Sequence, residues 1–102
     1  MAKKAKKGIE VAGMTVDGKP AFKGVFKLQD TFGLPLILMW QQLFDDGAVI
    51  AWDHYIQDAY KAGWSKAKVI SGIREIAQFG YQGEEGREFF SRITRMMEAA
   101  NG

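Results

Sequence analysis

His54 is the only histidine in the chain, and it is the first residue to consider for chemistry. In a helix, Asp58 would lie on the same face four residues later, and a histidine beside a carboxylate can act as a general base or a metal ligand. Either role needs further acidic or hydroxyl groups, and no spacing in the sequence directs such groups toward His54. A lone helical histidine beside an acid is usually a solvated pair, so an enzyme built on His54 and Asp58 ranks third among the functions considered.

Two pairs of acids and one glycine-rich segment also carry chemical groups. Asp45-Asp46 ends one predicted helix and Glu84-Glu85 begins another, where acids are typical caps or surface groups. The segment 80–86 contains three glycines and precedes a helix, as an anion-binding loop would. However, no lysine, serine or threonine follows as a phosphate loop requires, and the two glutamates would repel phosphate. We interpret the segment as a turn, and we expect no cofactor, no metal and no small-molecule substrate.

Composition narrows the class of protein further. The chain has no cysteine, which excludes disulfides, thiolate zinc sites and cysteine nucleophiles and predicts a cytoplasmic location. Hydrophobic residues make up 47% and charged residues 25%, which is an ordinary globular balance. The longest apolar run, 34–40, ends at Gln41 and is far short of the ~20 residues of a membrane span. We expect no membrane association.

The first eight residues form a basic arm. Lys3, Lys4, Lys6 and Lys7 lie there with no acid among them, and without them the net charge falls from +2 to −2. Such an arm on a slightly acidic body is typical of a tether to a polyanion or to an acidic protein surface. A solubilising tail is an equally good interpretation. We expect residues 1–8 to be a flexible arm.

Residues 9–28 have the pattern of a hairpin-like extended segment. Short β-type runs alternate with glycines, and Asp17-Gly18 is a preferred hairpin turn. Pro20 cannot donate a hydrogen bond to a sheet, so a strand that contains it should lie at an edge or be irregular.

Residues 29–102 carry helical signals and form the predicted helical domain. The first predicted helix, about 35–45, has Pro35 in its first turn after Asp30 and Thr31, and it should stop at Gly47. Its apolar residues cover most of its circumference, so we expect it to be buried on nearly all sides, in a core or in a partner.

Three more helices follow the first. One spans about 52–62 and ends at Gly63, one is capped by Ser65 and stops near Gly80, and the last spans about 84–100. No strand–helix alternation indicates a parallel sheet. The predicted fold is therefore mainly α, with four short helices packed around one core after a hairpin-like or extended segment and the basic arm.

Aromatic residues make up 13% of the chain, which is many large rings for one small core. Trp40, Trp52 and Tyr81 are candidates for exposed partner-binding residues, because tryptophan and tyrosine dominate the energetics of protein interfaces. An aromatic-rich core with half-covered rings explains the same composition equally well.

The stretch 26–38, FKLQDTFGLPLIL, resembles a short element of alanyl-tRNA synthetases whose consensus runs like LYDTYGFPLDLT. The likeness is carried by Leu28, Asp30, Thr31, Phe32, Gly33, Pro35, Leu36 and Leu38. The class-defining catalytic motifs of that family are absent, so the resemblance implies no aminoacylation and at most nominates Asp30 for RNA contact. In its size, aromatic-rich helices and basic arm, the whole chain resembles small structural and assembly proteins of tailed bacteriophages.

These observations predict a non-catalytic assembly or adaptor protein that binds a protein partner or a second copy of itself. The phage resemblance implies a virion or assembly component located in the host cytoplasm and the virion. The alternative is a nucleic-acid-binding protein that uses the lysine-rich arm. The predicted binding residues are Lys3, Lys4, Lys6, Lys7, Asp30, Trp40, Trp52 and Tyr81.

Overall fold

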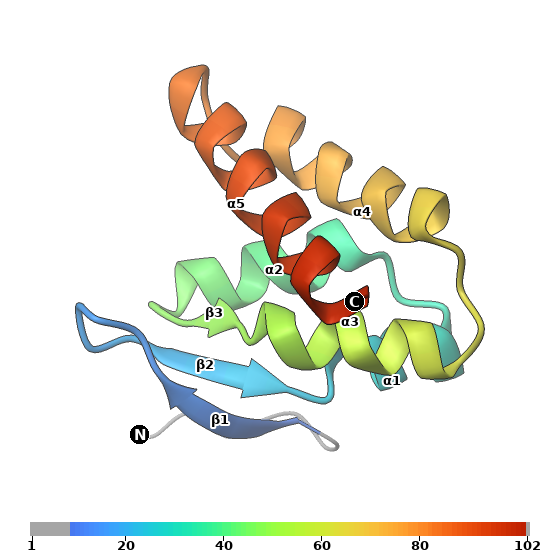
Figure 1. The fold of residues 1–102 in the computed structure, drawn as a ribbon. Coiled ribbons are helices and arrows are strands. Elements are labelled where there is room, and N and C mark those ends of the chain that lie inside the picture. The colour runs from blue at the N-terminus through green and yellow to red at the C-terminus, as the bar shows by residue number, and fades with distance from the viewer. Residues whose placement is uncertain (1–8, 102) are drawn as a thin grey trace. The chain divides into compact units, whose positions relative to one another are not determined.

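The computed structural model describes residues 9–101, in which the chain is mainly helical with a small sheet near its amino-terminal end (Figure 1). These residues form five helices and three strands, so the mainly α prediction is confirmed, although the number of helices is five rather than four. The chain divides into two compact units, an N-terminal unit (Met1–Ala51) and a C-terminal unit (Trp52–Gly102). The lysine-rich arm lies outside the described residues.

The N-terminal unit opens with the predicted hairpin. β1 (Glu10–Met14) pairs antiparallel with β2 (Pro20–Lys23), and a β-bulge lies between Val11 and Gly13. The connection is five residues long rather than the two of a tight turn. It is closed by the amide of Thr15, which donates to the Lys19 carbonyl at 2.8 Å, and Gly18 adopts the left-handed conformation that the loop requires.

A third strand, which no pattern in the sequence predicted, completes the sheet. β3 (Val49–Ile50) runs parallel to β2, so β2 is central in the order β1-β2-β3. Of the two alternatives for the proline-containing strand, an edge position is wrong, and the structure has the irregular pairing instead, with a bulge in the β1–β2 ladder. The sheet tolerates Pro20 because it is the first residue of β2, outside the two residues, Ala21 and Phe22, that pair with β3.

Helix α1 (Val25–Phe32) replaces the end of the predicted extended segment. Residues 25–28 are helical, which corrects the assignment of 9–28 as extended. Left-handed glycines flank the helix, and the amide of Gly33 donates to the Gln29 carbonyl to close its last turn. Val25, Phe26 and Leu28 are buried, and burial of this face stabilises the helix. At eight residues, the helix is too short for its sequence pattern to predict it.

Helix α2 (Leu36–Asp45) follows an extended Pro35 and ends two residues before left-handed Gly47, close to the predicted bounds. Leu38 and Phe44 are exposed, so the chain's own core does not bury this helix on nearly all sides, and the predicted burial in a partner stays a prediction. The residues that were expected to open this helix, Asp30 and Thr31, instead belong to α1.

The C-terminal unit contains α3 (Trp52–Lys61), α4 (Lys66–Phe79) and α5 (Glu84–Asn101), which are the three further helices predicted from the sequence. Gly63 is left-handed after α3, and Ser65 caps α4 by accepting the Lys68 amide at 3.1 Å. The α4 and α5 helices lie side by side (Figure 1). The fully buried side chains of this unit include Ile56, Ala59, Val69, Ile73, Ile76, Ile93 and Met97. Within residues 9–101, no helix combines the length and the apolar character that crossing a membrane requires.

Candidate functional site

The tryptophans predicted to bind a partner lie in the protein interior. Trp40 is 6% exposed and stacks on Phe44 with ring centroids 5.0 Å apart. Trp52 is 7% exposed and meets the rings of Tyr55 and Phe89 edge-on, at 5.4 and 5.5 Å. The expectation that these two rings are exposed is wrong. Stacked and edge-on packing lets one small core bury more aromatic rings than the composition alone indicated.

The other predicted binding residues have different positions. Tyr81 is half-buried, and its ring centroid lies 4.9 Å from that of Phe89. Asp30 is exposed near the end of α1, so its proposed contact with RNA stays a prediction. Lys3, Lys4, Lys6 and Lys7 fall outside the described residues.

His54 and Asp58 both lie on α3 and are half-buried. Among the described residues, no hydrogen bond or ion pair joins their side chains, and no three histidine, aspartate or glutamate side chains form a metal-binding group. The backbone amide of His54 donates instead to the Asp53 carboxylate at 2.9 Å, within the first turn of the helix.

Large apolar side chains are exposed mainly in the N-terminal unit. They are Val11, Met14, Val16, Phe32, Leu34, Leu38 and Phe44, and the C-terminal unit adds Phe79. Three of them lie within seven residues at the connection between α1 and α2: Phe32 is 67% exposed, Leu34 39% and Leu38 58%. We call these three residues the α1–α2 apolar surface.

Local geometry explains why these three side chains are not folded inward. Gly33 turns the chain in the left-handed region, and Pro35 continues it in an extended conformation, so only three residues separate the two helices. On α2, the buried Leu36, Met39 and Trp40 occupy one side, and Leu38 lies on the opposite side of the helix. The apolar residues around most of the circumference of α2 indicated that one of them, such as Leu38, would be exposed. Nothing in the sequence distinguished Phe32 or Leu34 from core residues.

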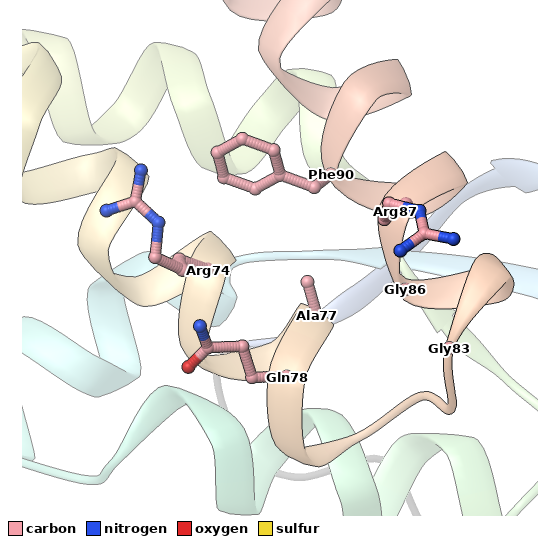
Figure 2. A pocket seen from close by; sticks show the side chains of 7 residues that line it. All are labelled: Arg74, Ala77, Gln78, Gly83, Gly86, Arg87 and Phe90. Carbon is pink, nitrogen blue, oxygen red and sulfur yellow. The ribbon is translucent and has the colours of Figure 1, made fainter.

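A second candidate site is an open pocket of about 490 Å³ on the α4–α5 hairpin, which we call the α4–α5 pocket (Figure 2). It is lined by Arg74, Ala77 and Gln78 from α4, by Gly83 just before α5, and by Gly86, Arg87 and Phe90 from α5. Two cations and one aromatic ring therefore share this lining with no carboxylate among its residues.

Gly86 sets how closely the two helices approach at the pocket. A Cβ atom at this position would lie 2.3 Å from the carbonyl oxygen of Ala77, a distance that no side chain tolerates. Only glycine permits this contact, which joins the first turn of α5 to the last turns of α4. The sequence showed the glycine but not the neighbour that requires it.

The two arginines of the pocket have different partners. The Arg74 guanidinium lies 5.3 Å from the centroid of the Phe90 ring, which is a cation–π distance. Arg87 forms an ion pair with Glu84, and both side chains of that pair are more than 70% exposed. Figure 2 shows Arg74 and Arg87 on either side of Phe90. The pocket thus presents positive charge around an aromatic ring.

Comparison with protein-family models, curated proteins and solved structures found no match to this chain. The resemblances to alanyl-tRNA synthetases and to phage assembly proteins therefore stay expectations from the sequence.

Proposed function

We propose that this chain is a non-catalytic protein-binding domain, an assembly or adaptor component, and that it docks through the α1–α2 apolar surface. The observation that carries the proposal is the exposure of Phe32, Leu34 and Leu38 within seven residues. Small soluble proteins rarely leave large apolar side chains grouped in this way unless a partner covers them.

Burial of these side chains would supply a useful share of a binding free energy. Covering a large apolar side chain contributes about 1.5–3 kcal/mol when it passes from full exposure to full burial. The three side chains are already partly covered, so a partner would gain on the order of 3 kcal/mol from the set. That gain is typical of the apolar centre of an interface, to which polar contacts at the rim add specificity.

Charge favours a protein over nucleic acid at this surface. Within residues 9–51 the chain has three lysines, no arginine and five acidic residues. One of the acids, Asp30, lies two residues before Phe32 and is exposed. A phosphate backbone would be repelled by this balance, whereas a neutral or apolar protein surface would not.

The test uses serine substitutions at exposed positions in the full chain. Phe32→Ser and Leu38→Ser should weaken binding to the partner, or self-association of the pure protein, at least tenfold. Their free energy of unfolding should stay within about 0.5 kcal/mol of wild type because both side chains are largely exposed. Phe79→Ser is the matched control, since Phe79 is an aromatic residue 75% exposed in the other unit.

Sedimentation equilibrium measures self-association, and affinity capture from the native source followed by titration with the identified protein measures partner binding. A wild-type chain that is strictly monomeric and retains no protein would reject the proposal. So would equal losses for Phe32→Ser, Leu38→Ser and Phe79→Ser.

Nucleic-acid binding by the arm is the second candidate, favoured by the four lysines that lie in the first seven residues without an acid. Four phosphate contacts would give log K against log salt a slope of about −3 to −4 on duplex DNA. Fluorescence anisotropy with a labelled duplex at 20 to 200 mM salt measures that slope. Undetectable binding at the lowest salt, or binding that salt does not change, rejects this candidate.

A further inference from the structure

We infer that the α4–α5 pocket binds an acidic peptide segment of a partner protein, with carboxylates at Arg74 and Arg87 and an apolar side chain on the Phe90 ring. The inference rests on the proposed protein-binding role but uses different residues from the α1–α2 apolar surface. The two proposals can therefore fail separately.

The charges in the pocket select the chemistry of the ligand. Its lining has two guanidinium groups and no carboxylate, and Arg74 lies on the Phe90 ring rather than in an ion pair with any described acid. Guanidinium groups bind carboxylates through paired N–H donors. A carboxylate that reached Arg74 would therefore gain a charge-assisted contact with a cation that no acid of the described residues neutralises.

Arg87 is also accessible to a ligand despite its pair with Glu84. The pair is exposed on both sides, and exposed pairs are worth about 0–1 kcal/mol. A guanidinium group carries five N–H donors, so a second carboxylate can share Arg87 or displace Glu84 from it. The amino-terminal end of the 18-residue α5 reaches the pocket at Gly83 and adds partial positive charge there.

The apolar part of the lining selects for a side chain between the two acids. Phe90 lies between Arg74 and Arg87, with Ala77 from α4 also lining the pocket (Figure 2). Arginine and aromatic residues together are typical of the strongest positions in protein interfaces. An acid–apolar–acid sequence would match this order of cation, ring and cation.

Nucleic acid fits this pocket less well than an acidic peptide. The C-terminal unit has seven basic and seven acidic residues, and Glu84, Glu85 and Glu88 lie in the first turns of α5 next to the pocket. These acids disfavour any polyanion, but nucleic acid carries a phosphate at every nucleotide, whereas a peptide needs a carboxylate only at each arginine and can place an apolar side chain on the Phe90 ring.

The experiment is an NMR titration of the ¹⁵N-labelled full chain with the peptide acetyl-Glu-Glu-Leu-Glu-Glu-amide. We expect saturable shifts at the amides of Ala77, Gln78, Gly83 and Gly86, and at least fivefold weaker binding of the same peptide with glutamine in place of each glutamate. Arg74→Gln and Arg87→Gln should each weaken binding of the glutamate peptide at least threefold.

Arg95→Gln is the matched control, because Arg95 is exposed on α5, outside the pocket, with its guanidinium 3.2 Å from the Ser91 hydroxyl. It should bind the peptide as wild type does, and so should Phe32→Ser, which tests the other proposal. An absence of saturable shifts, or equal weakening by Arg95→Gln, would overturn the inference. Saturable binding of a thymidine oligonucleotide at the same amides, without binding of the peptide, would assign the pocket to nucleic acid and overturn it as well.

Discussion

The two units are equal in length but use their apolar side chains differently. In the described part of the chain, seven large exposed apolar residues belong to the N-terminal unit, and Phe79 alone belongs to the C-terminal unit. Each helix of the C-terminal unit has one apolar side, which buries residues such as Ile56, Ile76 and Ile93. Helix α2 of the N-terminal unit is apolar around most of its circumference, so one side cannot be covered by its own fold.

The difference separates stability from binding. In the C-terminal unit most large apolar residues are buried in the core. The surface that this unit offers to a partner is the charged and aromatic α4–α5 pocket. In the N-terminal unit the apolar residues exceed what the small sheet and two short helices bury. Substitution of apolar residues should therefore mainly lower the free energy of unfolding in the C-terminal unit and mainly weaken partner binding in the N-terminal unit.

The largest expected effect comes from removing a buried side chain of the C-terminal unit. Ile93→Ala should lower the free energy of unfolding by about 2–5 kcal/mol, because Ile93 is 0% exposed and its loss leaves a cavity. Leu38→Ala, in the N-terminal unit, should cost less than about 0.5 kcal/mol because its side chain is 58% exposed.

Urea unfolding followed by circular dichroism measures both values. Similar losses for the two variants would remove the distinction between the units, and would mean that Leu38 is covered in the free protein.

A smaller loss should follow from widening the contact between α4 and α5. Gly86→Ala places a Cβ against the Ala77 carbonyl oxygen, and overpacking of this kind costs about 1–3 kcal/mol. Alanine recovers up to about 1 kcal/mol through its higher helix propensity, so the expected net loss is about 1–2 kcal/mol. Thermal and urea unfolding give the value.

Gly83→Asn is the matched control for that substitution. Gly83 has open space around it and a φ of 53°, which asparagine adopts more readily than other residues. It should change stability by less than about 0.5 kcal/mol. A Gly86→Ala variant that is as stable as wild type, or more stable, would show that the two helices are not held at this distance.

The contrast between the units also explains how much of the fold the sequence could predict. The three helices of the C-terminal unit were predicted with their ends, because each end depends on a local signal such as Gly63, Ser65 or Gly80. These signals act within one turn of the helix that they end.

In the N-terminal unit the decisive contacts are between distant residues. The two-residue strand β3 exists only through pairing with Ala21 and Phe22, more than 25 residues earlier, and no local pattern indicates so short a strand. Val25, Phe26 and Leu28 are compatible with either a strand or a short helix, and the hairpin before them favoured the wrong choice.

The candidate sites were only partly predictable for the same reason. Composition suggested exposed aromatic rings but could not show that Trp40 and Trp52 would be buried by ring packing. The arginines of the α4–α5 pocket are 13 residues apart in sequence, and their shared pocket follows from the hairpin that Gly86 permits. Of the residues in the two candidate sites, only Leu38 could have been predicted as an exposed binding residue, because α2 is apolar around most of its circumference.

The hairpin loop is the exception in the N-terminal unit, because local contacts hold it, and it provides the smallest predicted effect. The Thr15 hydroxyl lies 2.5 Å from the Asp17 carboxylate and donates to it, which lowers the pKa of Asp17, with smaller contributions from its own backbone amide and from Lys19. Thr15→Val should therefore raise the pKa of Asp17 toward its ordinary value of about 3.9.

The sign of the linked stability follows from the direction of that shift. A carboxyl group whose pKa is lower in the folded than in the unfolded chain stabilises the fold at pH values above its ordinary pKa. This stabilisation is lost as the pH falls through the lowered pKa. Wild type should therefore lose its small advantage over Thr15→Val as the pH falls below about 4. NMR titration of the Asp17 carboxyl carbon measures the pKa, and Lys19→Gln serves as the control that should shift it less. If Lys19→Gln shifts it more, the charge of Lys19 rather than the hydroxyl of Thr15 holds the loop, and the hairpin depends on salt instead of on a local hydrogen bond.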